Sequence, residues 1–480
     1  MIPLSLAEIT GIVGGRQYDI PDPGLLVTGP VVYDSRAVAP GGLFAAFRGE
    51  RVDGHDFARK AVEDGAVAVL AAHPIDGPGA PVPAIVVDDV ERALGALARA
   101  VVERIGTTVV GLTGSVGKTS TKDLIAQLLQ RRGPTVWPAG NLNNEIGLPV
   151  TALRADETTA HLVLEMGARG VGHIRYLAEL TPPRIGVVLN VGTAHIGEFG
   201  GREQIALAKG ELVEALPTAD EGGVAVLNAD DPHVRAMASR TKARTVLYGE
   251  AEDADVRAEN VRLLNGRPSF TLRTPTGCSD VTLQLYGEHH VSNALAAAAV
   301  AQELGMPVDE IALALSEAGQ LSRWRMEVTE RSDGVTVVND AYNANPDSMR
   351  AALRALVAMS EAGKAQGGRT WAVLGLMAEL GEESLAEHDA VGRLAVRLNV
   401  SKLVAVGGQE AAWLDMGAKN EGSWGEESVH VSDAQAAVDL LRRELRPGDI
   451  VLVKASRSVG LESVAAALLA GAGEGEVAGR

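Results

Sequence analysis

The chain has 480 residues, of which 46% are hydrophobic and 22% charged, so it is long enough for two to four globular domains and too apolar to be disordered throughout. Its 44 basic and 62 acidic residues give a formal net charge of −18, which argues against a large surface for nucleic acid or for an anionic membrane. A single cysteine, Cys278, excludes a disulfide framework and a multi-cysteine zinc site, and we expect this thiol to be buried.

The N-terminus has neither a basic segment nor a long apolar run, and no window of the chain approaches 18 uninterrupted apolar residues. We therefore expect no signal peptide and no transmembrane helix, and we expect the protein to be cytoplasmic.

Short apolar runs alternate with helical patterns along the whole chain. Because these runs are continuous rather than alternating, they are typical of strands covered on both faces, and they predict parallel sheets in α/β layers. The expected strands cover residues 66–72, 84–88, 108–112, 161–165, 184–190, 223–228, 335–339, 371–375, 402–406 and 449–453. Helical patterns lie between them, for example at 122–132 and 293–304.

Residues 255–286 break this rhythm, with short β patterns around an Asn265-Gly266 turn and a second turn at 275–277. They predict a small antiparallel meander beside the central sheet. Loops are expected at 363–369 and 416–427, and we expect the small, acidic tail from Ala470 to be frayed. Domain boundaries near residues 106 and 320 give domains at 1–106, 107–320 and 321–480.

The most informative motif is a glycine-rich turn between an apolar strand and a helix, with the sequence VVGLTGSVGKTS at 109–120. This is the context of a phosphate loop, in which backbone N–H groups point at the anion. Lys118 would reach the β- and γ-phosphates, and the Thr119 hydroxyl would bind Mg²⁺. The strict phosphate-loop pattern fails, since position 112 is Leu. The residues expected to contact the nucleotide here are Thr113, Gly114, Ser115, Val116, Gly117, Lys118, Thr119 and Ser120.

Three polar residues follow the phosphate loop at positions where their strands and helices face it. Glu165 ends an apolar strand, His195 follows the next strand, and Lys209 lies on a helical pattern. Taken singly, each is typical of a solvated strand end, a loop histidine or a surface lysine. Because the ends of neighbouring parallel strands converge on one crevice, Lys118, Glu165 and His195 together favour a site that holds metal ions against a triphosphate.

These blocks resemble the Mur ligases, ATP-dependent amide-forming enzymes of cell-wall precursor synthesis. Similar segments run across nearly the whole chain, at 113–119, 141–149, 165–167, 190–200, 208–212, 287–299, 325–328, 339–349, 388–392 and 451–462. The 112 residues before Thr113 leave room for a uridine-nucleotide domain. Residues 33–57 and the YNANPDSM string at 342–349 are similar to the member that joins D-alanyl-D-alanine to UDP-N-acetylmuramoyl-tripeptide.

The resemblance implies three α/β domains. The N-terminal domain binds the uridine nucleotide, the central domain has a phosphate-loop parallel sheet and binds ATP, and the Rossmann-like C-terminal domain binds the acceptor amine. The implied reaction passes through an acyl phosphate and yields UDP-N-acetylmuramoyl-pentapeptide, ADP and phosphate. The implied cofactors are ATP and Mg²⁺, the partners are the two small-molecule substrates, and we expect a monomer.

Individual residues are implied by the same resemblance. The catalytic set is Lys118, Lys209, Glu165 and His195, and the metal ligands are Thr119, Glu165, His195 and Lys209, with Lys209 as the family's carbamylated lysine. Further nucleotide contacts are Asn144, Asn293, Arg325, Asp340, Tyr342 and Asn343. The uridine-nucleotide substrate is assigned to Ser35, Arg36, Phe47, Gly49, Asp53, Gly54 and His55. Arg36 fits a diphosphate, and a surface arginine is the simpler alternative.

The sequence departs from the family at Trp324, where Gly is usual, at His290 for Asn, at Leu376 for an acidic residue and at Ala455 for Gly. Two other functions stay open. One is a Mur ligase that adds a diamino acid such as diaminopimelate to the dipeptide precursor, which the absence of a D-N-P-R string disfavours. The other is a phosphate-loop regulatory protein that binds nucleotide without ligase turnover.

Overall fold

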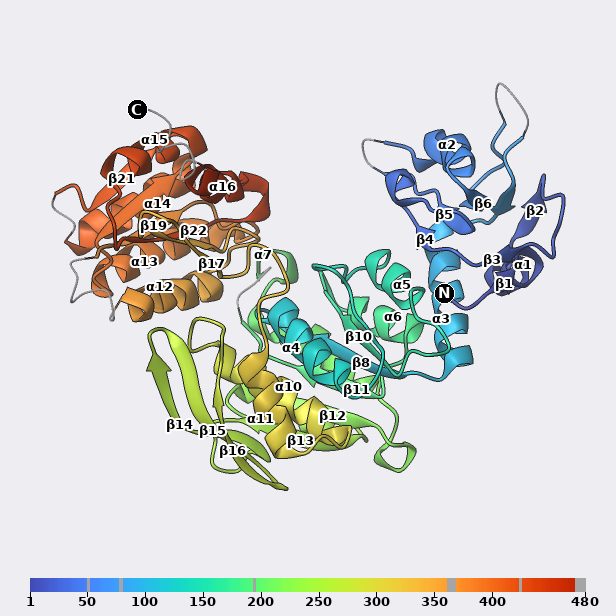
Figure 1. Ribbon diagram of the computed structural model, residues 1–480, viewed down its shortest axis with the longest axis horizontal. Helices are drawn as coiled ribbons and strands as arrows, with labels where there is room; N and C mark the ends of the chain where they lie inside the picture. Colours follow the sequence, from blue (N-terminus) through green and yellow to red (C-terminus); the bar gives the residue numbers. More distant parts are fainter. Residues whose placement is uncertain (50–51, 77–80, 193–195, 361–367, 423–424, 471–480) are drawn as a thin grey trace, which may run out of the picture.

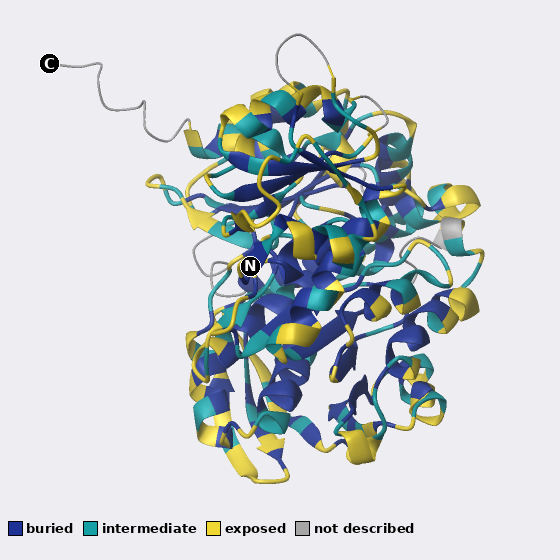
Figure 2. Ribbon diagram, turned by 90° about the vertical axis from the view of Figure 1, so that its right-hand side faces the viewer, coloured by how far each residue is buried: buried dark blue, intermediate teal, exposed yellow. Residues whose placement is uncertain are grey.

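The computed structural model describes residues 1–49, 52–76, 81–192, 196–360, 368–422 and 425–470. Three separate sheets follow one another along the chain, and each forms one lobe of the molecule (Figure 1). Buried residues concentrate on the strands and on the helix faces that cover them (Figure 2). The α/β architecture predicted from the continuous apolar runs is confirmed.

The first lobe is built on a five-stranded sheet in the order β2-β7-β6-β5-β4, in which only the β2–β7 pair is antiparallel. A two-stranded pair, β1-β3, lies beside it. The strands are β1 Leu4–Ser5, β2 Arg16–Tyr18, β3 Leu26–Val27, β4 Val31–Val32, β5 Gly42–Ala45, β6 Ala66–Ala71 and β7 Ala84–Val86. The helices are α1 Leu6–Val13, α2 Ala58–Glu63 and α3 Val90–Ile105, with short 3₁₀ turns η1 Ser35–Ala37 and η2 Gly54–Phe57.

The central lobe has a nine-stranded sheet in the order β16-β15-β14-β13-β12-β11-β8-β10-β9. Its strands are β8 Thr108–Thr113, β9 Thr135–Val136, β10 His161–Glu165, β11 Ile185–Val188, β12 Val224–Asn228, β13 Arg244–Gly249, β14 Val256–Leu264, β15 Arg267–Thr274 and β16 Gly277–Thr282. The predicted meander is present as β14–β16, and it continues the central sheet because β14 pairs in parallel with β13. Asn265 and Gly266 both have positive φ, as a tight hairpin turn requires.

The helices of this lobe are α4 Lys118–Gln130, α5 Gly147–Ala152, α6 His173–Leu180, α7 Ile196–Phe199, α8 Arg202–Glu214, α9 Pro232–Arg235, α10 His290–Glu303 and α11 Val308–Glu317, with 3₁₀ turns η3 Ala219–Glu221 and η4 Ala236–Arg240. Leu124, Ile125, Leu128 and Leu129 of α4 are fully or almost fully buried, and each such side chain contributes about 1.5–3 kcal/mol. Helix α10 packs against α4 through a run of buried alanines, whose small side chains allow close approach.

The third lobe has a six-stranded sheet in the order β17-β18-β22-β19-β20-β21, parallel except for β17. Its strands are β17 Glu327–Glu330, β18 Thr336–Asn339, β19 Thr370–Leu374, β20 Lys402–Val406, β21 Ser428–Val431 and β22 Ile450–Lys454. The helices are α12 Pro346–Ser360, α13 Ser384–Arg397, α14 Gln409–Glu421, α15 Ala434–Glu444 and α16 Glu462–Ala470, with 3₁₀ turns η6 Gly381–Glu383 and η7 Arg457–Val459.

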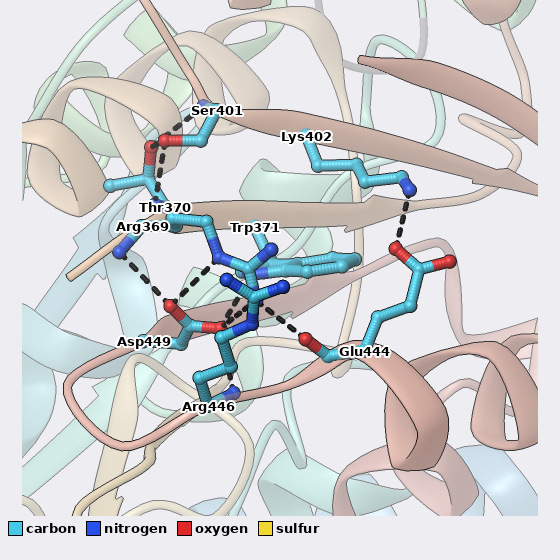
Figure 3. A network of polar contacts seen from close by, with 8 residues as sticks. All are labelled: Arg369, Thr370, Trp371, Ser401, Lys402, Glu444, Arg446 and Asp449. Carbon is cyan, nitrogen blue, oxygen red and sulfur yellow. Dashed lines mark hydrogen bonds and ion pairs between the residues drawn. The ribbon is translucent and has the colours of Figure 1, made fainter. Parts of the chain in front are cut away.

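A polar network ties the amino ends of the strands in this third sheet (Figure 3). The Asp449 carboxylate, just before β22, accepts hydrogen bonds from the Arg369 side chain, at 2.6 and 3.2 Å, and from Trp371 Nε1, at 3.1 Å. Trp371 is fully buried, and both Arg369 and Lys402 approach the face of its ring. This network joins β19, β20 and β22 at the edge of the sheet opposite to Lys454.

Two expectations were wrong. Cys278 is exposed, because it lies near the start of β16, which has a neighbouring strand on one side only. The predicted loop at 416–427 contains the last six residues of α14. A side chain at Gly417 would overlap the Asp389 carbonyl of α13, so this glycine allows two helices to pack closely and does not end one. Most of the predicted loop at 363–369, and the tail after Ala470, lie outside the described residues.

Candidate active site

The phosphate loop lies between β8 and α4, at the carboxyl edge of the central sheet. Gly117 has φ 82° and precedes α4 without a side-chain cap, so the first N–H groups of the helix are not bonded by a capping side chain. A Cβ atom at Gly117 would lie 2.7 Å from Asn293 Oδ1, so only glycine fits there. Lys118 Nζ folds back over the loop and donates to Gly114 O at 2.8 Å.

The loop is held from the neighbouring strand by Asn190, which follows β11. Asn190 Oδ1 accepts hydrogen bonds from the backbone N–H groups of Ser115, at 3.0 Å, and Val116, at 2.9 Å. Ser115 Oγ in turn accepts from the Gly192 N–H at 2.9 Å. Because β8 lies between β10 and β11 in the sheet, groups at the carboxyl ends of all three strands meet at this loop.

Glu165, at the end of β10, is buried and faces Thr119. The Thr119 hydroxyl donates to Glu165 Oε2 at 2.9 Å, and Asn143 Nδ2 donates to Oε1 at 2.7 Å. Arg325, from the third lobe, donates to Thr119 Oγ1 at 3.2 Å. Asn144 lines the same cavity, but its side chain accepts from the Gly147 N–H within its own turn.

The segment that carries Asn143 is anchored to the phosphate-loop helix. Lys122 of α4 is fully buried, and its Nζ donates to the carbonyl oxygens of Pro138, at 2.8 Å, and Gly140, at 3.0 Å. Helix α4 therefore fixes the loop glycine, the threonine and the segment opposite them in one rigid unit.

Two lysines lie close together at the site, and burial affects both. Burial lowers the pKa of Lys118, although the Glu165 carboxylate opposes this shift. For Lys209 of α8, burial and then the Lys118 ammonium lower the pKa well below its ordinary value. Among the described residues, the Lys209 side chain has no hydrogen bond or ion pair. Burial and the charge of Lys118 therefore both disfavour the protonated form of Lys209.

Asn293 lies beside two neighbouring histidines at the start of α10, whose rings are tilted against each other by 38°. The rings of His289 and His290 are 4.2 Å apart, and Asn293 Nδ2 is 3.3 Å from His290 Nδ1. Burial lowers the pKa of His289 to about 4, and burial and the neighbouring ring lower the pKa of His290 well below its usual range. Both rings are thus neutral near pH 7 and offer polar contacts without charge.

The third lobe contributes an arginine and a buried ion pair. Arg325 lies 4.1 Å above the Tyr342 ring, and Lys454 Nζ donates to Asp340 Oδ2 at 2.6 Å and to Asn343 O at 2.8 Å. Trp324 and Met326, on either side of Arg325, both have positive φ. A tryptophan in this left-handed region costs about 1–2 kcal/mol, and here its ring is covered by the Arg457 guanidinium at 4.3 Å.

One cavity of about 640 Å³ joins these groups, with walls from all three lobes. Fifteen of the residues predicted from the sequence line it: Gly114, Ser115, Val116, Gly117, Lys118, Thr119, Ser120, Asn144, Glu165, Lys209, Asn293, Arg325, Asp340, Tyr342 and Asn343. Thr113 is buried at the end of β8 behind the loop and is not part of the wall. His195 lies outside the described residues.

The residues assigned to the uridine nucleotide do not line this cavity. Arg36, next to Ser35 in η1, has an 88% exposed side chain and pairs with Asp34, which holds the Asp34 pKa at about 2. Asp53 accepts from His55 Nδ1 at 2.6 Å, so these two side chains brace their own turn.

The turn that contains Gly49 and Gly54 is also held by its own backbone. Gly49 N–H donates to Val52 O, and Gly54 N–H donates to Phe47 O. The Phe47 ring meets Tyr33 edge to face at 6.5 Å, and Tyr33 is the only residue of the first lobe, within the described ranges, that lines the large cavity.

Sequence reasoning missed Tyr33, Asn143, Asn190, Arg169 and Lys454 as parts of this site. The NLNNE string contains Asn143 beside the predicted Asn144, and Lys454 ends the apolar strand β22, so both carried a usable signal. Tyr33 and Asn190 begin the segments 33–57 and 190–200 that resemble the family, but each contacts a partner that only the fold brings close.

The oxygen atoms at Thr119 and Glu165 suit Mg²⁺, which keeps several waters and takes few protein ligands beside substrate phosphates. No group of three or more His, Cys, Asp or Glu residues able to hold a metal occurs in the described part of the chain. A single hydroxyl and a single carboxylate are nevertheless sufficient when phosphates complete the shell. No described helix is long and apolar enough to cross a membrane.

Three family models match the chain in sequence order. They are the Mur ligase family catalytic domain at residues 30–101, the Mur ligase middle domain at 112–301 and the Mur ligase glutamate ligase domain at 324–457. A curated relative from Mycobacterium leprae, named UDP-N-acetylmuramoyl-tripeptide–D-alanyl-D-alanine ligase, is 50% identical over 98% of this chain and 99% of its own length.

Solved structures give the same result. The UDP-N-acetylmuramoylalanyl-D-glutamyl-2,6-diaminopimelate–D-alanyl-D-alanyl ligase of Acinetobacter baumannii is 31% identical, with a TM-score of 0.83 over 98% of both chains. The MurF ligase of Thermotoga maritima in complex with ADP is 30% identical, with a TM-score of 0.79 over 93% of this chain and 98% of that one. From its three matched domains and its 50% identical full-length relative, the chain belongs to the Mur ligase family.

Proposed function

We propose that the chain is the ATP-dependent ligase that joins D-alanyl-D-alanine to UDP-N-acetylmuramoyl-tripeptide in peptidoglycan synthesis. The observation that carries this proposal is the hydroxyl of Thr119, which lies on the phosphate loop between Glu165 and Arg325 of the third lobe. The carboxylate that is activated and the amine that attacks it must meet beside the phosphate loop, and only a cavity with walls from all three lobes brings them there.

The first chemical step is phosphorylation of the terminal carboxylate of the peptide. A carboxylate oxygen attacks the γ-phosphorus, the bond from that phosphorus to the bridging oxygen breaks, and ADP leaves. Since an anion approaches a polyanion, positioning and charge neutralisation dominate this step. Lys118 and Arg325 are the cations placed to neutralise the triphosphate. Thr119 and Glu165 would hold Mg²⁺, which when bound neutralises further phosphate charge.

The second step is attack of the dipeptide amine on the acyl phosphate. A new C–N bond forms, the nitrogen loses a proton, and the tetrahedral intermediate expels phosphate. An α-amino group has a pKa of about 7.7–8.0, so a sizeable neutral fraction exists near pH 7 without a strong general base. Enclosure by three lobes excludes the water that would hydrolyse the acyl phosphate.

We assign a carbamate to Lys209. A neutral amine is the form that reacts with CO₂: a C–N bond forms, a proton leaves, and the lysine becomes an anionic oxygen ligand. The strongly lowered pKa of Lys209 supplies that form, and an anion there relieves the repulsion from Lys118. His195 is proposed as the remaining metal ligand.

We infer domain boundaries near residues 106 and 320. The first domain binds the uridine nucleotide through Ser35, Arg36 and the 47–56 turn, the second binds ATP with Asn293 at the adenine, and the third brings Asp340, Tyr342 and Asn343 to the nucleotide. With substrates made inside the cell, the reaction is cytoplasmic, and the chain works as a monomer.

The deciding experiment measures phosphate release from ATP and Mg²⁺, with UDP-N-acetylmuramoyl-tripeptide and D-alanyl-D-alanine added singly and together. We expect release only with both, and a pentapeptide mass in the product. Release that needs neither substrate would indicate a phosphate-loop NTPase without ligase turnover. Turnover with the dipeptide precursor and a diamino acid, but not with D-alanyl-D-alanine, would identify a different member of the family.

A further inference from the structure

The segment between β10 and α6, residues 166–172, forms one wall of the cavity and is fixed at both ends. Near its start, the Gly167 N–H donates to Asn143 O at 2.9 Å. At its end, the Glu211 carboxylate accepts from the N–H groups of Gly172, at 2.5 Å, and Arg175, at 3.1 Å. Glu211 is buried and lies two residues after Lys209 on α8. The wall is therefore built from the same elements as the catalytic centre.

Arg169 lies in the middle of this segment and lines the cavity with an exposed side chain. Its backbone N–H donates to His173 Nδ1 at 3.3 Å, but its guanidinium has no hydrogen bond, ion pair or ring contact with any described residue. Two other cationic groups of the wall have partners of their own. Arg325 stacks on Tyr342, and Lys454 pairs with Asp340.

Arg169 lines the cavity that the first lobe and the phosphate loop also line. It follows Glu165 by four residues, and Tyr33 of the first lobe lines the same cavity. Helix α3 of the first lobe packs against α5 and α6, which flank this wall (Figure 1). A substrate with its nucleotide in the first lobe and its terminal carboxylate beside Glu165 must run past this wall.

We propose that Arg169 is a specificity-determining residue that binds a side carboxylate of the muramoyl peptide, meaning one other than the carboxylate that is phosphorylated. The inference rests on the proposed function. A guanidinium presents a planar fork of donors that matches a carboxylate in two parallel hydrogen bonds, and it is charged at every relevant pH. An unpaired guanidinium in a protein of net charge −18 is a feature that an anionic ligand explains.

The chemistry of a muramoyl peptide supplies such groups. The substrate named for the Acinetobacter baumannii relative contains a D-glutamyl and a 2,6-diaminopimelyl residue, each of which has a carboxylate beyond the one that forms the new amide. Glu145 also lines the cavity, and its carboxylate lies 3.9 Å from Nδ1 of the His173 ring.

The test compares Arg169→Gln with Arg175→Gln, a matched control on α6 whose guanidinium contacts Glu214 outside the cavity. For Arg169→Gln we expect the KM for UDP-N-acetylmuramoyl-tripeptide to rise about ten- to a hundredfold, the range for loss of a hydrogen bond between charged groups. The kcat and the KM values for ATP and for D-alanyl-D-alanine should stay unchanged. Arg169→Lys should recover part of the loss, and the control should behave as wild type.

Altered substrates identify the carboxylate and separate this role from a structural one. A peptide with the glutamyl carboxylate converted to an amide, and a peptide with lysine in place of diaminopimelate, each remove one candidate. We expect Arg169→Gln and wild type to use one of these two peptides equally well. An equal KM rise with both peptides, or no rise with any, would overturn the role of Arg169. Loss of tripeptide-dependent turnover in the wild type would instead overturn the proposed function.

Discussion

Lys209 is the residue whose environment is most at odds with an ordinary lysine. Burial and the neighbouring Lys118 lower its pKa well below the usual value, which favours the neutral amine. We expect the protein to take up one carbamate from ¹³C-labelled bicarbonate, visible as a carbonyl signal in the ¹³C NMR spectrum. The signal should weaken as the pH falls and the amine is protonated.

The matched variant for this test is Lys209→Gln, which removes the amine and keeps an uncharged polar side chain. We expect it to lose the labelled signal and to reduce kcat by about a hundredfold or more, as loss of one electrostatic group at a reacting centre does. A carbamate signal that persists in Lys209→Gln would assign it to another amine, and full activity of this variant would exclude a catalytic carbamate.

At the residue scale, the sequence predicted the groups that are contiguous in motifs. Lys118 and Thr119 follow a strand and begin a helix, and this order alone predicted that they line the site cavity. Asn190 begins the segment 190–200 that resembles the family, but its role was not predicted, because it holds the backbone of residues some 75 positions away. The assignment of Arg36 to a diphosphate stays a prediction, and in the structure Arg36 pairs with its near neighbour Asp34.

At the scale of elements, continuous apolar runs predicted the long central strands, such as β10 and β20, because burial on both faces leaves no polar alternation. Strands β1 to β4 of the first lobe have only two or three residues each, too few to show any period, and they were missed, whereas β7 was predicted within the apolar run at 84–88. Helix α14 was cut short by the loop predicted at 416–427, whereas the close packing of α13 and α14 requires a residue without a side chain at Gly417.

The network at the amino ends of β19, β20 and β22 carries a prediction about stability. The Asp449 carboxylate accepts from Arg369, Trp371 and the Arg446 N–H, and it is almost fully buried (Figure 3). Replacing one partner of a buried pair leaves the other charge uncompensated, so Asp449→Asn should lower the free energy of unfolding by about 3–5 kcal/mol. Urea unfolding measures this loss, and the exposed Asp439→Asn in α15 should change little.

The same carboxylate predicts a pH dependence. Burial opposes its ionisation, but the hydrogen bonds from Arg369 and from backbone N–H groups outweigh burial and hold the Asp449 pKa below its ordinary value. A lowered folded-state pKa stabilises the protein above the unfolded pKa, and this contribution is lost as the pH falls through the folded pKa. We therefore expect the difference in the free energy of unfolding between wild type and Asp449→Asn to be constant near neutral pH and to become smaller below about pH 4. If the difference in the free energy of unfolding between wild type and Asp449→Asn does not change with pH, the effect comes from packing alone.

At the scale of the whole molecule, the site exists only where the lobes meet. Gly192 follows β11 and faces α12 of the third lobe, and a Cβ atom there would overlap Asp347 Oδ2 and lie 3.3 Å from Ser115 Cβ. The phosphate loop, by contrast, belongs entirely to the central lobe. A single methyl group added at Gly192 should therefore disturb closure of the third lobe while leaving ATP binding nearly intact.

We expect Gly192→Ala to bind ATP nearly as well as wild type, because the loop glycine, Lys118 and Thr119 keep their surroundings. Its kcat should fall about a hundredfold, since a displacement of about 1 Å between reacting groups is enough for such a loss. Calorimetric ATP titration and steady-state kinetics measure the two quantities. The control for a glycine-to-alanine change without steric overlap is Gly11→Ala on α1, where the new Cβ atom has nothing within 4 Å.

Asp347, which the added methyl group would overlap, allows a test of this steric cause. If the methyl group acts by pushing Asp347 away, then Asp347→Ala should mask part of the effect, and adding Gly192→Ala to it should cost clearly less than in the wild-type background. Strict additivity of the two changes would place the effect of Gly192→Ala in the phosphate loop, through Ser115, rather than in closure. A loss of ATP affinity as large as the loss in kcat would lead to the same conclusion, because the third lobe would then have no separate part in the defect.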